Sequence, residues 1–244
     1  MKKEVELSRR MQAVADIVSK GNRVCDVGCD HGYVSIYLIQ SRKAPSVLAM
    51  DVNKGPLMRA KEHVQQYQLE EYITLRLSDG LGAYRIGEAQ TLLCAGMGGR
   101  LLRNILSKEP EKTASFQELI LQPQSEIGLF RKFLREEGYL FLAENMILED
   151  GKFYPMMKVR RQKEGESVEN VSSMQLLLED MFGPLLLKER NPVLLQFIEQ
   201  ELAAKITILD GLQSQERTKK IQKREQELEE EIKLYQLARK QILE

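Results

Sequence analysis

The sequence is poor in the residues that bind metals or form disulfides. It contains three cysteines and two histidines among 244 residues. An odd number of cysteines without a histidine cluster is typical of reduced thiols in a cytosolic protein. The spacing of Cys25 and Cys29 is also too wide for a paired metal knuckle. We therefore expect no metal ion and a cytoplasmic location.

Long apolar segments and an excess of charge are absent too. No apolar run approaches the ~20 residues that a membrane span needs, and the N-terminal stretch MKKEVELSRRM lacks the apolar core of a secretory signal. We expect no membrane contact. Basic and acidic residues balance at 36 each, so the formal net charge is zero. This balance argues against nonspecific coating of nucleic acid but allows local basic patches, because phosphate contacts depend on where charges lie.

The first part of the chain alternates short apolar strands with amphipathic helices, which predicts a parallel sheet. Two longer segments then flank Asp150-Gly151, a pair typical of a hairpin turn, and would add an antiparallel pair. The expected fold is α/β, a seven-stranded Rossmann-like sheet of the class I methyltransferase pattern, rather than the six parallel strands of a dinucleotide dehydrogenase. The expected strands are 23–27, 47–52, 73–79, 91–95 and 118–123, and the expected helices are 8–19, 33–41, 56–68, 99–107 and 125–137.

The composition changes at about residue 162, which predicts a first domain over 1–162 and a helical C-terminal domain over 163–244. In the second domain a short helix should end at Gly183-Pro184, and Asn191 with Pro192 should begin a longer one. A further helix over about 217–243 has apolar residues at seven-residue intervals. Joined near Asp210 to Ser214, the two long helices would form an antiparallel, coiled-coil-like hairpin. The apolar residues at these intervals are Ile221, Leu228, Tyr235 and Ile242.

The segment DVGCDHG, from Asp26 to Gly32, is typical of a ligand-binding turn between a strand and a helix. Gly28 allows a tight turn and Gly32 a close approach at the helix start. The third glycine of the usual dinucleotide pattern is missing, and Asp30 stands in its place. Because a tight turn without a ligand explains the same residues, this motif alone is weak evidence for a site.

Two further acids follow predicted strands. Asp51 ends the second strand, where a carboxylate can accept hydrogen bonds from ribose hydroxyls, and Asp79 follows the third, where it can accept from an adenine amine. Asp79-Gly80 is also an ordinary turn pair. With Asp26, these acids should meet at the carboxyl edge of the sheet, where ligands of open α/β sheets bind. A ribose occurs in both S-adenosylmethionine and NAD, so Asp51 does not choose between them.

A second glycine-rich segment, AGMGG from Ala95 to Gly99, follows the fourth strand and would place bare backbone beside a ligand. Its alternative is a structural turn before the next helix. The Asn-Pro-Pro-Tyr loop of many amine methyltransferases is absent, which argues against exocyclic-amine chemistry.

The motifs VCDVGCDHGYVSIYL, DVNKGPLM, SDGL, AGMGGRLL, LILQPQSE and EDGKFYPMM together resemble those of the bacterial tRNA adenine-N1 methyltransferases of the TrmK type, which modify adenine 22. The resemblance is close over about 7–160 and looser beyond. It implies S-adenosylmethionine as cofactor, tRNA as substrate and a coiled-coil C-terminal domain. On this basis we expect the cofactor to contact Asp26, Gly28, Cys29, Asp30, His31, Gly32, Asp51, Val52, Asp79, Gly80, Ala95, Gly96 and Met97.

We expect the substrate to contact Tyr33, Gly98, Gly99, Arg100, Gln122 and Pro123. Adenine N1 has its own lone pair, so the protein mainly positions the base, which must be extruded from the tRNA. A carboxylate would stabilise the cationic product. Asp30 and His31 are the expected catalytic residues. An alternative interpretation is that these two residues only shape the turn.

Clusters of basic residues could hold the RNA backbone, although such a cluster is more often a solvated surface. The C-terminal helical arm could instead serve dimerisation, but we expect a monomer. Two rival functions stay open, a methyltransferase-like RNA-binding module without catalysis and an NAD-dependent oxidoreductase. The clusters are Arg9/Arg10, Arg100/Arg103, Lys158/Arg160/Arg161/Lys163 and Arg217/Lys219/Lys220/Lys223/Arg224.

Overall fold

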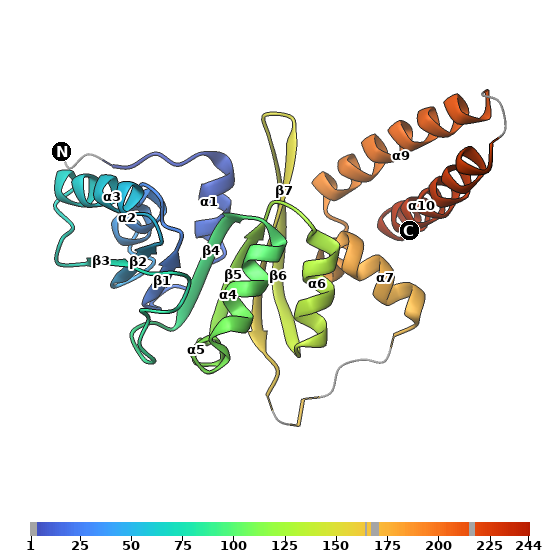
Figure 1. Ribbon diagram of the computed structural model, residues 1–244. Coiled ribbons are helices and arrows are strands. Elements are labelled where there is room, and N and C mark those ends of the chain that lie inside the picture. Colours follow the sequence, from blue (N-terminus) through green and yellow to red (C-terminus); the bar gives the residue numbers. More distant parts are fainter. Residues whose placement is uncertain (1–3, 164, 167–170, 215–217) are drawn as a thin grey trace. The chain divides into compact units, whose positions relative to one another are not determined.

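The computed structural model describes residues 4–163, 165–166, 171–214 and 218–244 (Figure 1). The chain divides into two compact units, residues 1–168 and 169–244. The boundary expected at 162/163 therefore lies inside the first unit. None of the described helices is long and apolar enough to cross a membrane.

The first unit is built on a seven-stranded sheet with the order β3-β2-β1-β4-β5-β7-β6. Five strands are parallel, and the last two form an antiparallel hairpin. Its turn is Asp150-Gly151, and both residues have the positive φ angles that a tight hairpin turn requires. The predicted mixed sheet is confirmed. The strands are β1 (Val24–Val27), β2 (Val47–Asp51), β3 (Ile73–Leu77), β4 (Thr91–Met97), β5 (Glu118–Pro123), β6 (Tyr139–Glu149) and β7 (Lys152–Arg161).

Helices cover both faces of this sheet, and each face has its own apolar cluster. One cluster contains residues of α1 (Arg9–Asp16), α2 (Tyr33–Gln40) and α3 (Lys54–Gln66). The other contains residues of α4 (Gly99–Lys108) and α6 (Ile127–Glu136), which the short helix α5 (Pro110–Ala114) separates in sequence. Because the helices lie on the two faces, the loops that follow the parallel strands gather at the carboxyl ends of those strands.

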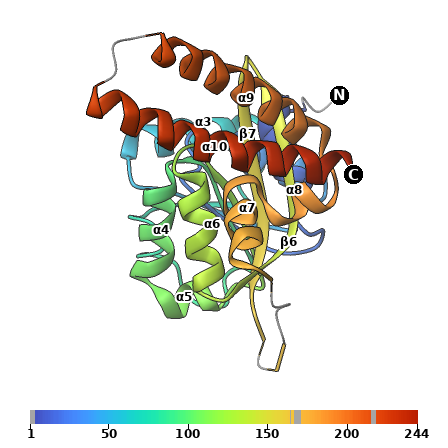
Figure 2. The same cartoon turned by 90° about the vertical axis from the view of Figure 1, so that its right-hand side faces the viewer.

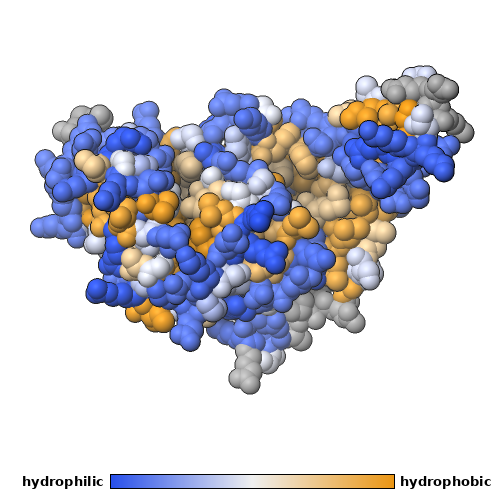
Figure 3. Space-filling model, in the orientation of Figure 1, coloured by the Kyte–Doolittle hydropathy of each residue, from blue (hydrophilic) through white to orange (hydrophobic). Residues whose placement is uncertain are grey.

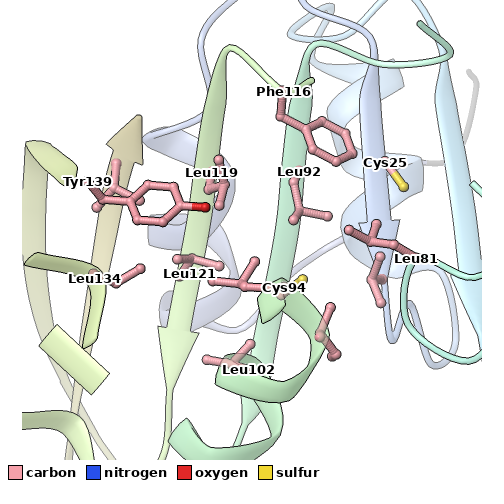
Figure 4. Close-up of a cluster of buried hydrophobic side chains, with 14 of the residues drawn as sticks. Cys25, Leu81, Leu92, Cys94, Leu102, Phe116, Leu119, Leu121, Leu134 and Tyr139 are labelled. Atoms are coloured by element: carbon pink, nitrogen blue, oxygen red, sulfur yellow. The ribbon is translucent and has the colours of Figure 1, made fainter. Parts of the chain in front are cut away.

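Alternation along the strands divides the apolar side chains between the two clusters. Figure 4 shows Cys25, Leu92 and Leu119 from three neighbouring strands in the cluster beneath α4. Burial raises the pKa of the Cys25, Cys29 and Cys94 thiols. These cysteines are all free, and as protonated thiols they serve as apolar packing residues.

The second unit contains a long helical hairpin. α9 (Pro192–Gln213) and α10 (Lys219–Leu243) run side by side in opposite directions in both views (Figures 1 and 2). The Asn191 side chain accepts hydrogen bonds from the first N–H groups of α9, as a helix N-cap does. Leu228, Tyr235 and Ile242 are buried, as their seven-residue spacing predicts, whereas Ile221 at the start of the helix is half-buried. α7 (Ser173–Phe182) and α8 (Pro184–Lys188) complete the unit.

Apolar side chains also gather on the solvent side of α9 (Figure 3). Ile206 and Ile208 are 41% and 50% exposed.

Several predicted details are wrong. α1 ends at Asp16 rather than at 19, α3 begins at Lys54 rather than at 56, and β3 ends at Leu77 rather than at 79. The helix expected to end near Asp210 continues through Gly211 to Gln213, although glycine disfavours a helix by roughly 1 kcal/mol. The strand expected to end at 95 extends to Met97. The short helices α5 and α8 were not expected. Pro184 was expected only to end the preceding helix, but it also begins α8, because proline suits the first turn of a helix.

Candidate active site

The turn after β1 is tied to the end of β2 by backbone and carboxylate hydrogen bonds. The N–H groups of Gly28 and Cys29 donate to the carbonyl oxygen of Met50 over 2.8 and 3.0 Å. The N–H of Asp30 donates to Oδ2 of Asp51 over 3.2 Å, and that of Asn53 donates to Oδ1 over 2.8 Å. Asp51 thus fixes both the turn and the start of α3.

Backbone conformation explains the residue types of this turn. Gly28 and Gly32 have φ angles of +74° and +75°, which disfavour any side chain. Asp30 also lies in the left-handed region, with φ +50°. Aspartate and asparagine tolerate this conformation better than most residues, so the turn keeps a carboxylate where a glycine would be less strained.

A pocket opens beside this turn, which we call the turn pocket. It brings together seven of the predicted site residues: Asp26, Gly28, Cys29, Asp30, His31, Tyr33 and Ala95. The N-terminal segment forms another wall through Glu6, Leu7, Ser8 and Met11, with Val34 and Leu93 behind. Sequence reasoning missed that wall, because the segment carries no motif and reaches the site only through the packing of α1.

Negative charge collects at the turn pocket. Asp26 is buried and accepts a hydrogen bond of 2.6 Å from the hydroxyl of Ser35. Burial, and then the charge of Asp51, raise the pKa of Asp26 to about 6, against the effect of Ser35. The Asp30 side chain is 68% exposed, with one oxygen 3.5 Å from Nε2 of His31. The pocket is therefore suited to a ligand that brings positive charge.

Seven predicted cofactor residues do not line the turn pocket: Gly32, Asp51, Val52, Asp79, Gly80, Gly96 and Met97. Asp79 forms an ion pair of 2.6 Å with Lys108 and lines, with Gly80, a second pocket beside α4. Val52 follows β2 and is 58% exposed, so its apolar side chain is available to a ligand. The structure thus groups Asp26 with the turn and Asp79 with α4.

The two halves of the segment from Ala95 to Gly99 have different structural roles. Gly96 lies at an irregularity of β4, has φ +75°, and donates its N–H to Oε1 of Gln122 over 3.0 Å. Any side chain on Gly28 would collide with the methyl group of Met97, so these residues are in close contact. Gly98 and Gly99 pack against the loop before α6, where a Cβ on Gly99 would lie 2.6 Å from the carbonyl oxygen of Ser125. Packing therefore explains Gly99 without a ligand.

Arg10 and its neighbour Arg9 differ in their surroundings. The Arg10 guanidinium donates to Oε1 of Gln122 over 3.0 Å and lies 4.9 Å from the centre of the Tyr154 ring. Its backbone N–H donates to Glu149. Arg9 is exposed. Arg10 is thus held at the edge of the sheet next to Gly96. Gln122 is fully buried beneath it, and the following residue, Pro123, is also buried.

The remaining basic clusters separate into paired and exposed side chains. Lys158, Arg160 and Arg161 form ion pairs with Glu118, Glu166 and Glu137, so they hold the unit together. Arg100 is exposed and lines a pocket with Arg103 between the starts of α4 and α6. On α10, Arg224 pairs with Glu227. Lys219, Lys220 and Lys223 are exposed, and Lys223 lies 3.9 Å from Glu227. Arg217 lies outside the described residues.

Within the described ranges, no group of three histidine, cysteine, aspartate or glutamate side chains is placed to hold a metal ion.

The raised pKa of Asp26 predicts a pH-dependent cost to stability. Between pH 4 and pH 6 the folded protein binds more protons than the unfolded chain, so stability should fall as the pH rises through this window. The loss should amount to about 3 kcal/mol at most, at 1.36 kcal/mol per pKa unit.

The substitution Asp26→Asn tests this prediction. It keeps an acceptor for Ser35 and should remove the fall in stability with rising pH, which raises the free energy of unfolding at pH 7. Denaturant unfolding from pH 4 to 7.5 measures it, with Asp150→Asn in the exposed hairpin turn as control. Parallel pH profiles for Asp26→Asn and the unaltered protein would contradict the assignment.

Comparisons with known proteins agree with this geometry. Residues 7–157 match the family model described as a methyltransferase domain. The chain is 32% identical over 231 residues to the tRNA (adenine(22)-N(1))-methyltransferase of Bacillus subtilis, covering 95% of this chain and 96% of the relative. The crystal structure of the B. subtilis m1A22 tRNA methyltransferase TrmK superimposes with a TM-score of 0.82 at 31% identity, covering 97% of this chain and all of that one.

A second solved structure carries a ligand. The Streptococcus pneumoniae protein Sp1610, a candidate tRNA (m1A22) methyltransferase in complex with S-adenosyl-L-methionine, superimposes with a TM-score of 0.81 at 31% identity, over 96% of this chain and 100% of that one. Sequence, sheet order and the glycine turn therefore agree, and the chain belongs to the TrmK-type tRNA (adenine(22)-N(1))-methyltransferase family.

Proposed function

We propose that this protein transfers the methyl group of S-adenosylmethionine to N1 of adenine 22 in tRNA. The observation that carries the proposal is the turn pocket, which presents Asp26 and Asp30 beside the bare backbone of Gly28 in a chain of this family. Such a function places the protein in the cytoplasm, with its substrate.

The charge of the turn pocket distinguishes this cofactor from NAD. S-adenosylmethionine carries a sulfonium and an ammonium group, whereas NAD carries a negatively charged diphosphate. A cationic ligand stabilises the ionised form of a buried carboxylate, and an anionic ligand does the opposite. Asp26 and Asp30, which line the turn pocket, therefore favour S-adenosylmethionine. The antiparallel β6–β7 hairpin, which the sheet of a dinucleotide dehydrogenase lacks, also argues against an NAD-dependent oxidoreductase.

The residues around Gly28 fit this cofactor. The bare backbone of the turn allows close approach, and each carboxylate oxygen of Asp51 keeps a lone pair for a ribose hydroxyl after accepting one backbone N–H. Asp26 and Asp30 would face the cationic methionine part. The bound cofactor supplies an electrophilic methyl group and leaves as S-adenosylhomocysteine.

The chain's own task is to position the base. The N1 lone pair of adenine attacks the methyl carbon as the carbon–sulfur bond breaks, so no side chain has to remove a proton first. Alignment of the two reactants can contribute about 7 kcal/mol or more. Positive charge then develops on adenine, and the exposed carboxylate of Asp30 is placed at the pocket to stabilise it. His31, at 3.5 Å from that carboxylate, orients it.

The second unit would hold the tRNA backbone. Lys219 and Lys220 occupy the first turn of α10, where the helix dipole makes positive side chains unfavourable for the helix itself. Together with Lys223 they concentrate positive charge at the end of the hairpin, a location suited to phosphate groups.

Mass spectrometry of nucleosides tests the function directly. Unmodified tRNA incubated with the full chain and labelled S-adenosylmethionine should gain one label, as 1-methyladenosine. Changing adenine 22 to guanine should abolish the gain. Label at another base would contradict the proposed substrate position, and tight tRNA binding without label would instead support a non-catalytic RNA-binding module.

Substitutions at Asp30 separate charge from turn geometry. Asp30→Asn and Asp30→Gly both suit the left-handed backbone, and both remove the carboxylate. If Asp30 stabilises the developing charge, both should lower the single-turnover rate at saturating cofactor and tRNA by ~10²–10³-fold, with cofactor and tRNA affinities nearly unchanged. A weaker cofactor affinity with a normal rate would assign Asp30 to the methionine ammonium group. A normal rate together with normal affinities would show that Asp30 only shapes the turn.

Neutralising Lys219, Lys220 and Lys223 to glutamine should weaken tRNA binding and flatten its salt dependence. Each lost phosphate contact should reduce the slope of log affinity against log salt by about 0.9. The control is the matched triple change of Lys233, Arg239 and Lys240, exposed residues toward the other end of α10. Equal slopes for the two variants would show that this end of the hairpin has another purpose.

A further inference from the structure

Both histidines of the chain lie beside Tyr33, a residue that lines the turn pocket. The rings of His31 and Tyr33 are almost parallel, at 4° with centroids 6.0 Å apart. His63, on α3, stacks on Tyr33 at 4.6 Å and lies 5.9 Å from His31. We call these three residues the aromatic platform. Since they come from the turn, α2 and α3, their association is a property of the fold rather than of a local motif.

Hydrogen bonds hold the platform in place. Nδ1 of His63 lies 2.9 Å from the carbonyl oxygen of His31, and Nε2 lies 3.2 Å from the hydroxyl of Tyr33. A carbonyl oxygen only accepts, so in the neutral ring Nδ1 carries the proton and Nε2 accepts from the Tyr33 hydroxyl. His63 thus fixes the orientation of the Tyr33 ring while its own polar atoms are occupied by the protein.

The platform is nevertheless open to a ligand. Tyr33 is 41% exposed and the His31 side chain 35% exposed. His31 and Tyr33 line the same pocket as Cys29, Asp30 and Ala95. An aromatic surface of this kind, next to the site where a base must be methylated, can replace the stacking that the base loses when it leaves the RNA helix.

We propose that the aromatic platform stacks on the extruded target adenine of the tRNA, with Tyr33 as the contact surface and His63 as the positioning residue that orients it. Stacking fixes the plane of the base, and the N1 lone pair lies in that plane, so the platform sets the direction of attack. The inference rests on the proposed function and adds the place where the base is held.

A binding cycle tests this without relying on turnover. The protein is saturated with S-adenosylhomocysteine, and its affinity is measured for tRNA with adenine 22 and for the same tRNA with an abasic site there. Base–aromatic stacking contributes roughly 1–3 kcal/mol, so the full chain should prefer the adenine tRNA by about 5- to 150-fold. Tyr33→Ala should remove most of this preference, and His63→Ala part of it. Comparing both proteins on both RNAs cancels any effect of the abasic site on tRNA structure.

Two variants serve as controls. Tyr33→Phe keeps the ring and should retain most of the preference. Tyr72→Ala removes an exposed tyrosine just before β3, outside the turn pocket, and should change nothing. Affinity for S-adenosylhomocysteine reports on folding and should be normal in every variant.

Three results would overturn the platform. They are the absence of any preference in the full chain, an equal loss of affinity for both tRNAs in Tyr33→Ala, and a loss of S-adenosylhomocysteine affinity that accounts for the effect. Methylation of adenine 22 by the full chain is measured alongside. If it occurs while the cycle shows no coupling, only the platform fails; if it does not occur, the proposed function fails.

Discussion

The carboxylate of Asp51 joins the turn after β1 to the start of α3, and the arrangement of the site depends on this contact. One oxygen accepts the N–H of Asp30 and the other that of Asn53. The two N–H groups use different oxygens, and an asparagine would replace one of those oxygens with an NH2 donor, so in this geometry one backbone N–H would lose its acceptor. Asp51 is therefore needed by the fold before any ligand arrives. This explains how a non-glycine residue, Asp30, can be kept in a left-handed conformation at the centre of the turn.

The same contact has an electrostatic cost. Burial, and then the nearby charge of Asp51, raise the pKa of Asp26 to about 6. At neutral pH Asp26 is therefore ionised against the cost of its burial and the repulsion from Asp51, which lowers the stability of the fold. A cationic cofactor relieves this repulsion on binding, so part of its affinity comes from strain that the folded protein already contains. Such a loss of stability at a functional site is common in enzymes.

The elements that could be predicted from the sequence are those with a local signal. Alternating strands and helices, the Asp150-Gly151 turn and the seven-residue spacing of Leu228, Tyr235 and Ile242 each depend on neighbours along the chain. The contacts of Arg10 do not, since Gln122 and Glu149 are 112 and 139 residues away. For the same reason Arg10 resembled a free RNA-binding cation, and the stacking of His63 on Tyr33 had no sequence signal. Asp79 was placed at the correct strand end, but its pairing with Lys108 depends on how α4 packs.

The separation of these contacts implies a division of tasks between the two units. Lysines at the end of α10 can contact phosphates, which position an RNA but carry no information about its sequence. We therefore expect recognition of one adenine to come from the first unit, where Tyr33, His31 and Asp30 line the turn pocket in which we propose the methyl group is delivered. Stacking accepts every base because every base has an aromatic face. The choice of adenine then depends on its edge, since only a base with an in-plane lone pair at the methyl group can react, and on the tRNA structure that exposes that base.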